Sequence, residues 1–187
     1  NGQITANMNN ACFGFKTTAV SPTFQCYEDN VPVTCTQGAC NSYASGSGVH
    51  LFASSAGTHT FKVVATDTTY GLVDSNPPTF TWTVDNTNPS LTLNSISPGS
   101  FNSTTGNFHS NSTIPVASLT IGEAATATVQ LDAAAAVTCN TLSASGIFSC
   151  QLPTAAAGSH TLTFDATDSA GNSAVDIVTA IVIDTTN

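Results

Sequence analysis

The chain has 187 residues and a formal net charge of −9, with two lysine or arginine residues against eleven aspartate or glutamate residues. Only 7% of its residues are charged, so its acidity reflects missing cations. Two lysines, Lys16 and Lys62, cannot neutralise a row of phosphates or bind an anionic lipid surface. These numbers exclude nucleic acid as a partner, and no apolar run long enough to insert in a membrane is present.

A hydrophobic fraction of 41% supports a folded core. No two of the six cysteines have the C-x-x-C spacing that is typical of a zinc ribbon or finger. The cysteines are Cys12, Cys26, Cys35, Cys40, Cys139 and Cys150. Six cysteines among few charges and many small polar residues favour disulfides and an oxidising compartment.

The chain contains an internal repeat. Residues 56–67 (AGTHTFKVVATD) return as residues 157–168 (AGSHTLTFDATD), and shorter matches precede and follow them in the same order. Asn88-Pro89 disfavours a helix across the junction. We therefore expect two domains, residues 1–87 and 88–187.

Both repeats have the period of β-strands. In residues 60–66 and 161–167 apolar and polar residues alternate, and residues 79–84 do the same around Trp82. Residues 113–121, 127–131 and 176–183 are further strand candidates, whereas the alanine runs 124–127 and 133–136 are too short for stable helices. Short strands separated by Gly, Ser, Asn and Pro predict an all-β fold of two tandem immunoglobulin-like β-sandwiches.

The strings TFQC (23–26), PVTC (32–35), GTHTF (57–61), VATD (64–67) and TWTVD (81–85) resemble bacterial immunoglobulin-like repeats found in tandem in large surface adhesins and other exported proteins. AGSHTL (157–162) and ATDSAGN (166–172) resemble the same superfamily. The resemblance implies an extracellular or bacterial cell-surface location, with adjacent repeats of the same chain as partners.

Pairing within each repeat would join Cys139 to Cys150 and leave three arrangements for the first four cysteines. We favour Cys26–Cys35, because the flanking strands of the repeat bring them together, and Cys12–Cys40 for the remaining two.

Calcium is the one metal that the resemblance implies, at the junction between repeats. A set of hard oxygen ligands would come from Asp85, Asn86, Asp165, Asp168 and Asn172. The alternative is that Asp168 and Asn172 only shape an Asx-type turn and that Asp85 caps its strand. No other cofactor is expected.

Catalysis has little support. His59 and His160 occupy the same repeat position, where a turn leads into a strand, so a structural hydrogen bond explains them better than acid–base chemistry. No Gly-x-Ser-x-Gly elbow, phosphate-binding loop or zincin motif is present. The sequons at Asn102 and Asn111 lie in a polar stretch, residues 97–112, that we expect to be a hydrophilic loop or, in a eukaryotic protein, a glycan site.

These observations predict a non-enzymatic adhesin segment whose immunoglobulin-like modules act as a stalk that presents a binding region. One alternative is that the first domain is itself a head for a host- or prey-cell glycan or protein, using Tyr43, His50, Phe52 and the loop at Tyr70. Another is an accessory module of a secreted hydrolase.

Overall fold

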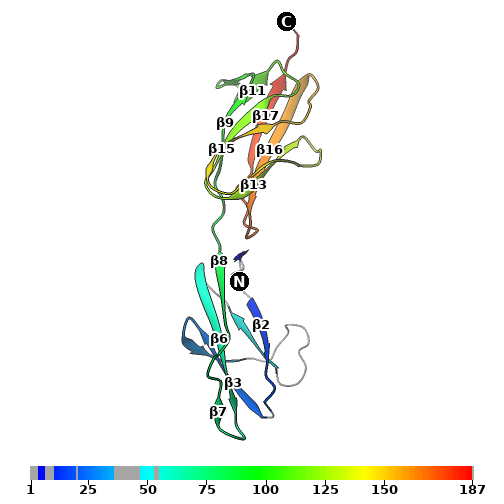
Figure 1. Ribbon diagram of the computed structural model, residues 1–187. Coiled ribbons are helices and arrows are strands. Elements are labelled where there is room, and N and C mark those ends of the chain that lie inside the picture. Colours follow the sequence, from blue (N-terminus) through cyan, green and yellow to red (C-terminus); the bar gives the residue numbers. More distant parts are fainter. Residues whose placement is uncertain (1–3, 7–10, 20, 36–46, 53–54, 187) are drawn as a thin grey trace. The chain divides into compact units, whose positions relative to one another are not determined.

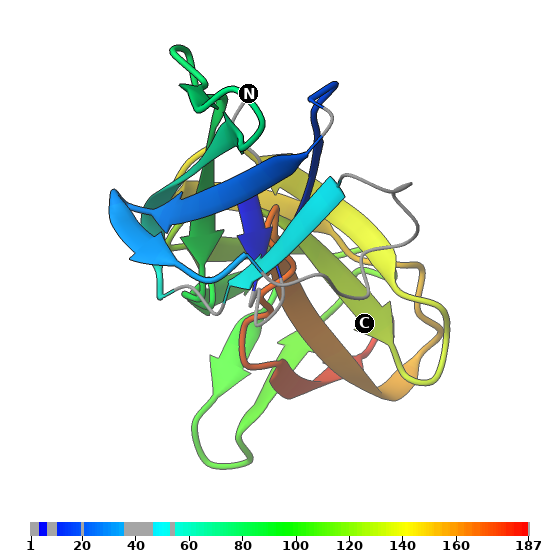
Figure 2. The same ribbon diagram turned by 90° about the horizontal axis from the view of Figure 1, so that it is seen from below.

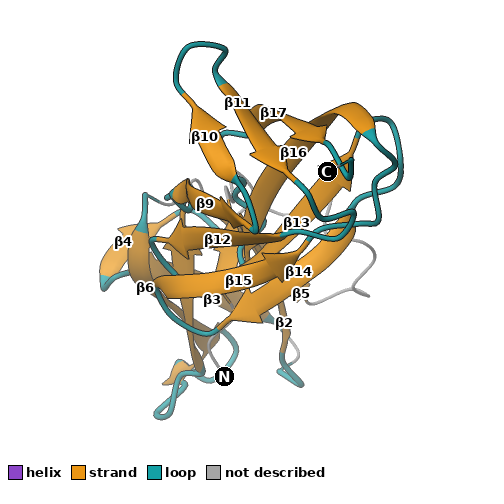
Figure 3. Ribbon diagram, turned by 90° about the horizontal axis from the view of Figure 1, so that it is seen from above, coloured by secondary structure: helices purple, strands orange, loops and turns teal. Residues whose placement is uncertain are grey.

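The computed structural model describes residues 4–6, 11–19, 21–35, 47–52 and 55–186. They form two compact units, Asn1–Asn86 and Thr87–Asn187, so the division falls one residue before the expected one (Figure 1). Every regular element of the described residues is a strand, as Figure 3 shows. Among these residues no helix has the length and apolar character needed to cross a membrane.

The first unit has a larger sheet and a two-stranded sheet. The larger sheet has the order β1-β8-β6-β3-β4, with β7 paired to the end of β6. Its strands are β1 (Ile4–Ala6), β3 (Pro22–Glu28), β4 (Val31–Val33), β6 (Gly57–Asp67), β7 (Leu72–Val73) and β8 (Thr79–Asp85). The second sheet pairs β2 (Ala11–Lys16) with β5 (Ser47–Phe52).

Alternation along β6 and β8 builds the core of the first unit. Phe61 and Val63 of β6 and Trp82 and Val84 of β8 are buried with Cys26 of β3. Lys62 lies on the outward side of β6, where its Nζ is 4.5 Å from the centre of the Tyr27 ring. The strands expected around residues 60–66 and 79–84 are therefore confirmed with the predicted faces.

The second unit has a six-stranded sheet and a three-stranded sheet. The six-stranded sheet has the order β10-β11-β17-β16-β13-β14, and the smaller sheet has the order β15-β12-β9. The strands are β9 (Leu91–Ser97), β10 (Ser100–Asn102), β11 (Asn107–Ser110), β12 (Val116–Ile121), β13 (Ala125–Leu131), β14 (Val137–Leu142), β15 (Gly146–Gln151), β16 (Gly158–Asp168) and β17 (Ile177–Ile183).

The inward faces of these two sheets form a continuous core. Leu119, Val129, Leu162, Phe164 and Ile181 are each at most 1% exposed. They come from β12, β13, β16 and β17, so both sheets contribute to the core, as in any β-sandwich.

The two units share their pattern of strand pairing. In each, a long strand that begins at glycine, β6 or β16, lies between two antiparallel neighbours: β3 and β8 in the first unit, β13 and β17 in the second. A short early strand also pairs in parallel with the last strand, β1 with β8 and β11 with β17. The repeat seen in the sequence is thus a repeat of topology.

One segment differs from expectation. Residues 97–112, expected to be a hydrophilic loop, contain the β10–β11 hairpin, which projects from the second unit in Figures 2 and 3. The hairpin forms because Phe101 and Phe108 lie opposite each other, with ring centres 5.0 Å apart, and because β11 pairs with β17, a contact between residues distant in sequence.

Candidate functional site

An aspartate and a histidine clasp two strands of the second unit. Asp132 lies in the turn after β13 with a φ of 50°, and its Oδ2 is 2.8 Å from Nδ1 of His160. Its Oδ1 accepts a hydrogen bond from the backbone N–H of Thr161, and its own N–H donates to the carbonyl of Thr161, both at 2.8 Å. Nε2 of His160 lies 3.0 Å from the carbonyl oxygen of Ala156.

The first unit contains the same clasp. Asp29 has a φ of 49°, and its Oδ2 is 2.8 Å from Nδ1 of His59. Oδ1 accepts from the N–H of Thr60 at 2.7 Å, while Nε2 of His59 is 2.8 Å from the carbonyl oxygen of Ser55. The structural hydrogen bond expected at both histidines is confirmed.

Both nitrogens of each ring therefore face an oxygen that accepts hydrogen bonds. A neutral imidazole carries a single N–H, so only the protonated ring donates to both oxygens. Hydrogen bonds to Asp132 and Ala156 raise the pKa of His160. Burial lowers the pKa of His59, but hydrogen bonds to Asp29 and Ser55 outweigh it, so that this pKa is raised as well. In both clasps the geometry and the direction of the pKa shift favour the protonated form of the histidine.

The aspartate partners of the two histidines are not among the predicted site residues, although the sequence contains one sign of them. Asp29 and Asp132 are separated by nearly the same number of residues as the two histidines, and Asp132 directly follows the predicted strand at residues 127–131. The left-handed φ at both positions suits aspartate, whose short side chain tolerates that conformation better than most.

The predicted calcium ligands of the second unit do not all meet. Asp168 faces the core side of β16 and is 9% exposed, whereas Asp165 lies on the opposite face of the same strand. Oδ1 of Asp165 accepts a hydrogen bond from the N–H of Ala166 at 2.7 Å. Asp165 therefore does not join Asp168 in one ligand set.

Asp168 and Asn172 form the Asx-type turn expected as the alternative to calcium. Oδ1 of Asp168 accepts from the N–H groups of Ala170 and Asn172, at 2.8 and 2.9 Å, and Oδ2 accepts from the side-chain amide of Asn172 at 2.9 Å. Burial raises the pKa of Asp168, but these hydrogen bonds outweigh it and hold that pKa below its ordinary value. Asp85 and Asn86 belong to the other unit, so calcium at the junction stays a prediction.

Two of the three predicted disulfides are confirmed. Cys26 and Cys35 have Cα atoms 5.5 Å apart and tie β3 to the segment after β4. Cys139 and Cys150, with Cα atoms 4.8 Å apart, join β14 to β15 and so link the two sheets of the second unit. The predicted Cys12–Cys40 bond lies outside the described residues.

Of the residues proposed for a ligand surface on the first unit, the structure describes the side chain of Tyr70. Tyr43 and the side chains of His50 and Phe52, both on β5, lie outside that description. Tyr70 is 74% exposed, beside Leu72 and Val73 at 66% and 59%. Leu72 and Val73 belong to β7, which pairs with the end of β6 and so forms a hairpin. This hairpin presents three large apolar side chains to solvent.

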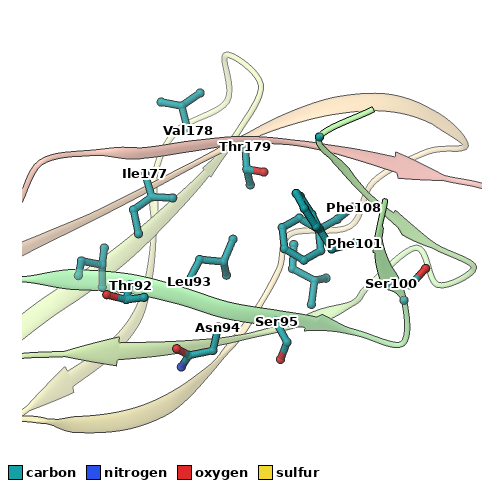
Figure 4. Close-up of a pocket in the computed structure, with 14 residues that line it drawn as sticks. Thr92, Leu93, Asn94, Ser95, Ser100, Phe101, Phe108, Ile177, Val178 and Thr179 are labelled. Carbon is teal, nitrogen blue, oxygen red and sulfur yellow. The ribbon is translucent and has the colours of Figure 1, made fainter. Parts of the chain in front are cut away.

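A groove in the second unit was not foreseen. It has a volume of about 690 Å³ and runs between β9 and β17, closed at one end by the β10–β11 hairpin. Figure 4 shows Leu93 and Ile177 pointing toward each other across it, with Phe101 and Phe108 at its end. Its volume falls within the range of ligand pockets in proteins. Its lining residues are Leu91, Thr92, Leu93, Asn94, Ser95, Ile96, Gly99, Ser100, Phe101, Gly106, Phe108, Ile177, Val178 and Thr179.

The family model described as "Bacterial Ig-like domain" matches residues 87–185, more than half of the chain and nearly all of the second unit. The chain belongs to the bacterial Ig-like domain family. No curated protein shows significant sequence similarity to it.

One solved structure agrees with this bacterial Ig-like domain assignment at the level of fold. The chain is similar to the fibronectin(III)-like modules of Clostridium thermocellum CbhA, with 14% identity and a TM-score of 0.51 over 97% of this chain and 89% of that chain. The D00-D0 domain of intimin matches at 10% identity and a TM-score of 0.34, over 94% of this chain and 95% of that one.

The aspartate–histidine pairs of this bacterial Ig-like domain chain have a structural role. Asp132 and His160 form hydrogen bonds with each other and with backbone groups, and Asp29 and His59 do the same in the first unit. The groove offers apolar side chains and no charged group, which suits binding better than acid–base chemistry.

Proposed function

We propose that the chain is a non-catalytic segment of an extracellular or cell-surface bacterial protein, in which two tandem Ig-like modules act as a load-bearing spacer. Membership of the bacterial Ig-like family and the two disulfides support the location. The partners proposed for it are the adjacent Ig-like repeats of its own chain.

Parallel pairing of an early strand with the last strand carries the load-bearing part of this proposal. In the first unit Ile4 pairs with Thr83, and in the second Ser110 pairs with Ile183, both in parallel. Pulling the two ends of such a unit apart slides the paired strands along each other. Their hydrogen bonds are then strained together rather than opened one after another, which gives resistance to force.

Force spectroscopy on the whole chain, held by its two ends, tests this proposal. Asp184 donates its N–H to the carbonyl of Ser110 at 2.9 Å, so by alternation along β17 the N–H of Val182 also points to β11. Val182→Pro removes that hydrogen bond and is expected to lower the unfolding force of the second unit.

Val178→Pro is the matched control. The N–H of Val178 points to the same side of β17 as that of Val182, but β11 ends before it reaches Val178, so this N–H has no partner in β11. This variant is expected to leave the unfolding force near that of the unmodified chain. Equal forces for Val182→Pro and the unmodified chain would contradict the load-bearing role of the β11–β17 pair.

A second function is favoured by the apolar hairpin of the first unit. Tyr70, Leu72 and Val73 are exposed at its tip, and exposed apolar clusters mark interaction sites. We propose as the alternative that this hairpin contacts a glycan or protein on another cell. A glycan array and cell-binding assay on the whole chain, with Tyr70→Ser and Leu72→Ser beside the control Thr69→Ser, would detect such a role.

The two functions predict different results in that assay. Binding that both hairpin variants abolish and Thr69→Ser keeps would make the first unit a head rather than a spacer. If no binding is found, or if the unmodified chain and the three variants bind equally, the hairpin is not a ligand-binding site.

A further inference from the structure

The edge of β17 is only partly covered. Parallel pairing with β11 covers Ile181 to Ile183, through Phe108, His109 and Ser110. Along residues 177–180, the described part of the chain supplies no strand on that side. The groove beside β9 opens at this uncovered stretch.

The uncovered stretch presents backbone hydrogen-bonding groups. Backbone groups of successive residues in a strand point to alternate sides, and β17 pairs with β16 without a shift in register. Since the N–H of Asp184 points to β11, the N–H and C=O of Val178 and the N–H of Ala180 point to the same side. Because β11 does not extend as far as Val178 and Ala180, these three backbone groups lie on the uncovered edge of β17.

The groove beneath this edge is apolar and half-buried. Leu93, Phe108 and Ile177 are partly buried and pack against the core cluster of the second unit. Phe101 adds a ring that is 55% exposed and is packed on Phe108. None of the fourteen lining residues has a charged side chain, although the chain has a net charge of −9.

The opposite wall is less suited to strand pairing. In β9 the register against β12 shifts between Ser118 and Leu119, so Asn94 is an extra residue in the edge strand. Its side chain also donates to Thr120 at 2.9 Å. Bulges of this kind twist an edge and hinder the addition of another strand.

We propose that this groove binds an extended peptide segment that is uncharged and carries apolar side chains at alternate positions. The segment pairs in parallel with Val178 and Ala180, in line with β11, and places its apolar side chains over Leu93, Ile177 and Phe101. The parallel β11–β17 pairing shows that a strand fits beside β17, and the uncharged lining selects against charged segments. This binding role is separate from the load-bearing role.

NMR titration of the whole chain with a synthetic peptide tests the proposal. The probe is a capped five-residue peptide of alternating threonine and valine, and the control is the same peptide with alternate backbone nitrogens methylated. The probe is expected to shift the amide signals of Val178 and Ala180 and to slow their hydrogen exchange. The methylated peptide, which cannot form the ladder, is expected to bind at least about tenfold more weakly.

Variants separate backbone pairing from apolar contact. Ala180→Pro removes the open N–H but no hydrogen bond of the protein, and it is expected to weaken peptide binding about tenfold, whereas Ala180→Ser keeps it. Phe101→Ser is expected to weaken binding by removing part of the apolar surface. Unchanged melting temperatures of these variants would show that each has kept its fold.

Three results would overturn the proposal: no shift at Val178 or Ala180 at millimolar peptide, equal binding of the methylated peptide, or full binding by Ala180→Pro. If Ala180→Pro fails to fold, the methylated peptide and Phe101→Ser still decide the question. The unfolding force does not depend on these outcomes, so the load-bearing proposal can stand or fall independently.

Discussion

Nδ1 of His160 lies 2.8 Å from Oδ2 of Asp132, and the other nitrogen of that ring faces a backbone carbonyl. The same arrangement joins His59 to Asp29. In both units the ring is thus fixed between a carboxylate and a carbonyl, next to the start of the long strand of the larger sheet. The protonated histidine is the form that this geometry stabilises.

Stability is expected to fall as the pH rises above neutral. The pKa values of His59 and His160 are raised above the ordinary value of 6.5 in the folded chain. Their contribution is therefore complete below that value and is lost as the pH passes through the raised pKa values. Melting temperatures measured from pH 5 to pH 9 would show a decline that begins near pH 6.5.

At acidic pH the carboxylates give the opposite dependence. The pKa values of Asp29, Asp132 and Asp168 are lowered from 3.8, so their contribution is complete above that value and is lost as the pH falls through the lowered values. His160→Asn together with His59→Asn is expected to flatten the decline at high pH and also to reduce the acid limb, because the two histidines help to lower the pKa values of Asp29 and Asp132, whereas the contribution of Asp168 remains. A decline of unchanged size in the double variant would contradict the role of the clasps.

Removing the Cys139–Cys150 bond is expected to destabilise the second unit. The bond closes a loop with a sequence separation of 11 and joins the two sheets. Replacing both cysteines with alanine should cost about 3 kcal/mol in the free energy of unfolding, according to the chain-entropy estimate for loops of this length. Urea denaturation of the variant and of the unmodified chain measures this difference, and equal midpoints would show that the bond adds no stability.

Gly57 and Gly158 are expected to be sensitive to substitution for conformational reasons alone. Their φ angles are 133° and 135°, and a Cβ at either position would meet no atom within 4 Å. Gly57→Ala and Gly158→Ala should each cost about 1–3 kcal/mol through backbone strain. Gly146→Ala is the matched control, because a Cβ there meets Leu142 at an ordinary 3.9 Å and no positive φ is involved. Equal stability of all three variants would contradict this account.

Calcium at the junction of the two units, which stays a prediction, can be tested by melting the chain with calcium and with a chelator. If calcium binds, the melting temperature rises with calcium concentration, because a ligand that binds only the folded state stabilises it. Asp168→Asn should then abolish the rise. An unchanged melting temperature would leave Asp168 with the Asx-type turn alone, which its hydrogen bonds already explain.

The sequence predicted the elements that depend on local pattern. Alternation placed Phe61, Val63, Trp82 and Phe164 on inward faces, and the structure buries all four. The repeated strings predicted that the same strand would recur, and β6 and β16 have the same length. These predictions succeeded because side-chain direction in a strand follows residue parity, which can be read without knowing any partner.

Two features of the site were not predicted, for different reasons. The calcium set combines Asp165 with Asp168, but the alternation of residues 161–167, which the sequence already shows, puts these two side chains on opposite faces of β16. The aspartates of the clasps were missed because their partners lie about thirty residues further along the chain and meet them only through the pairing of the sheet.

By itself, then, the sequence determined that the chain is a repeated all-β protein with disulfides and too few cations for nucleic acid, because composition and period are local quantities. Only the tertiary structure decided where the aspartate–histidine pairs and the groove lie. The aspartate–histidine pairs form where a turn lies beside the start of a strand that is distant in sequence. The groove arises because β11 ends before β17 does, and the register of strands distant in sequence depends on packing that no single segment contains.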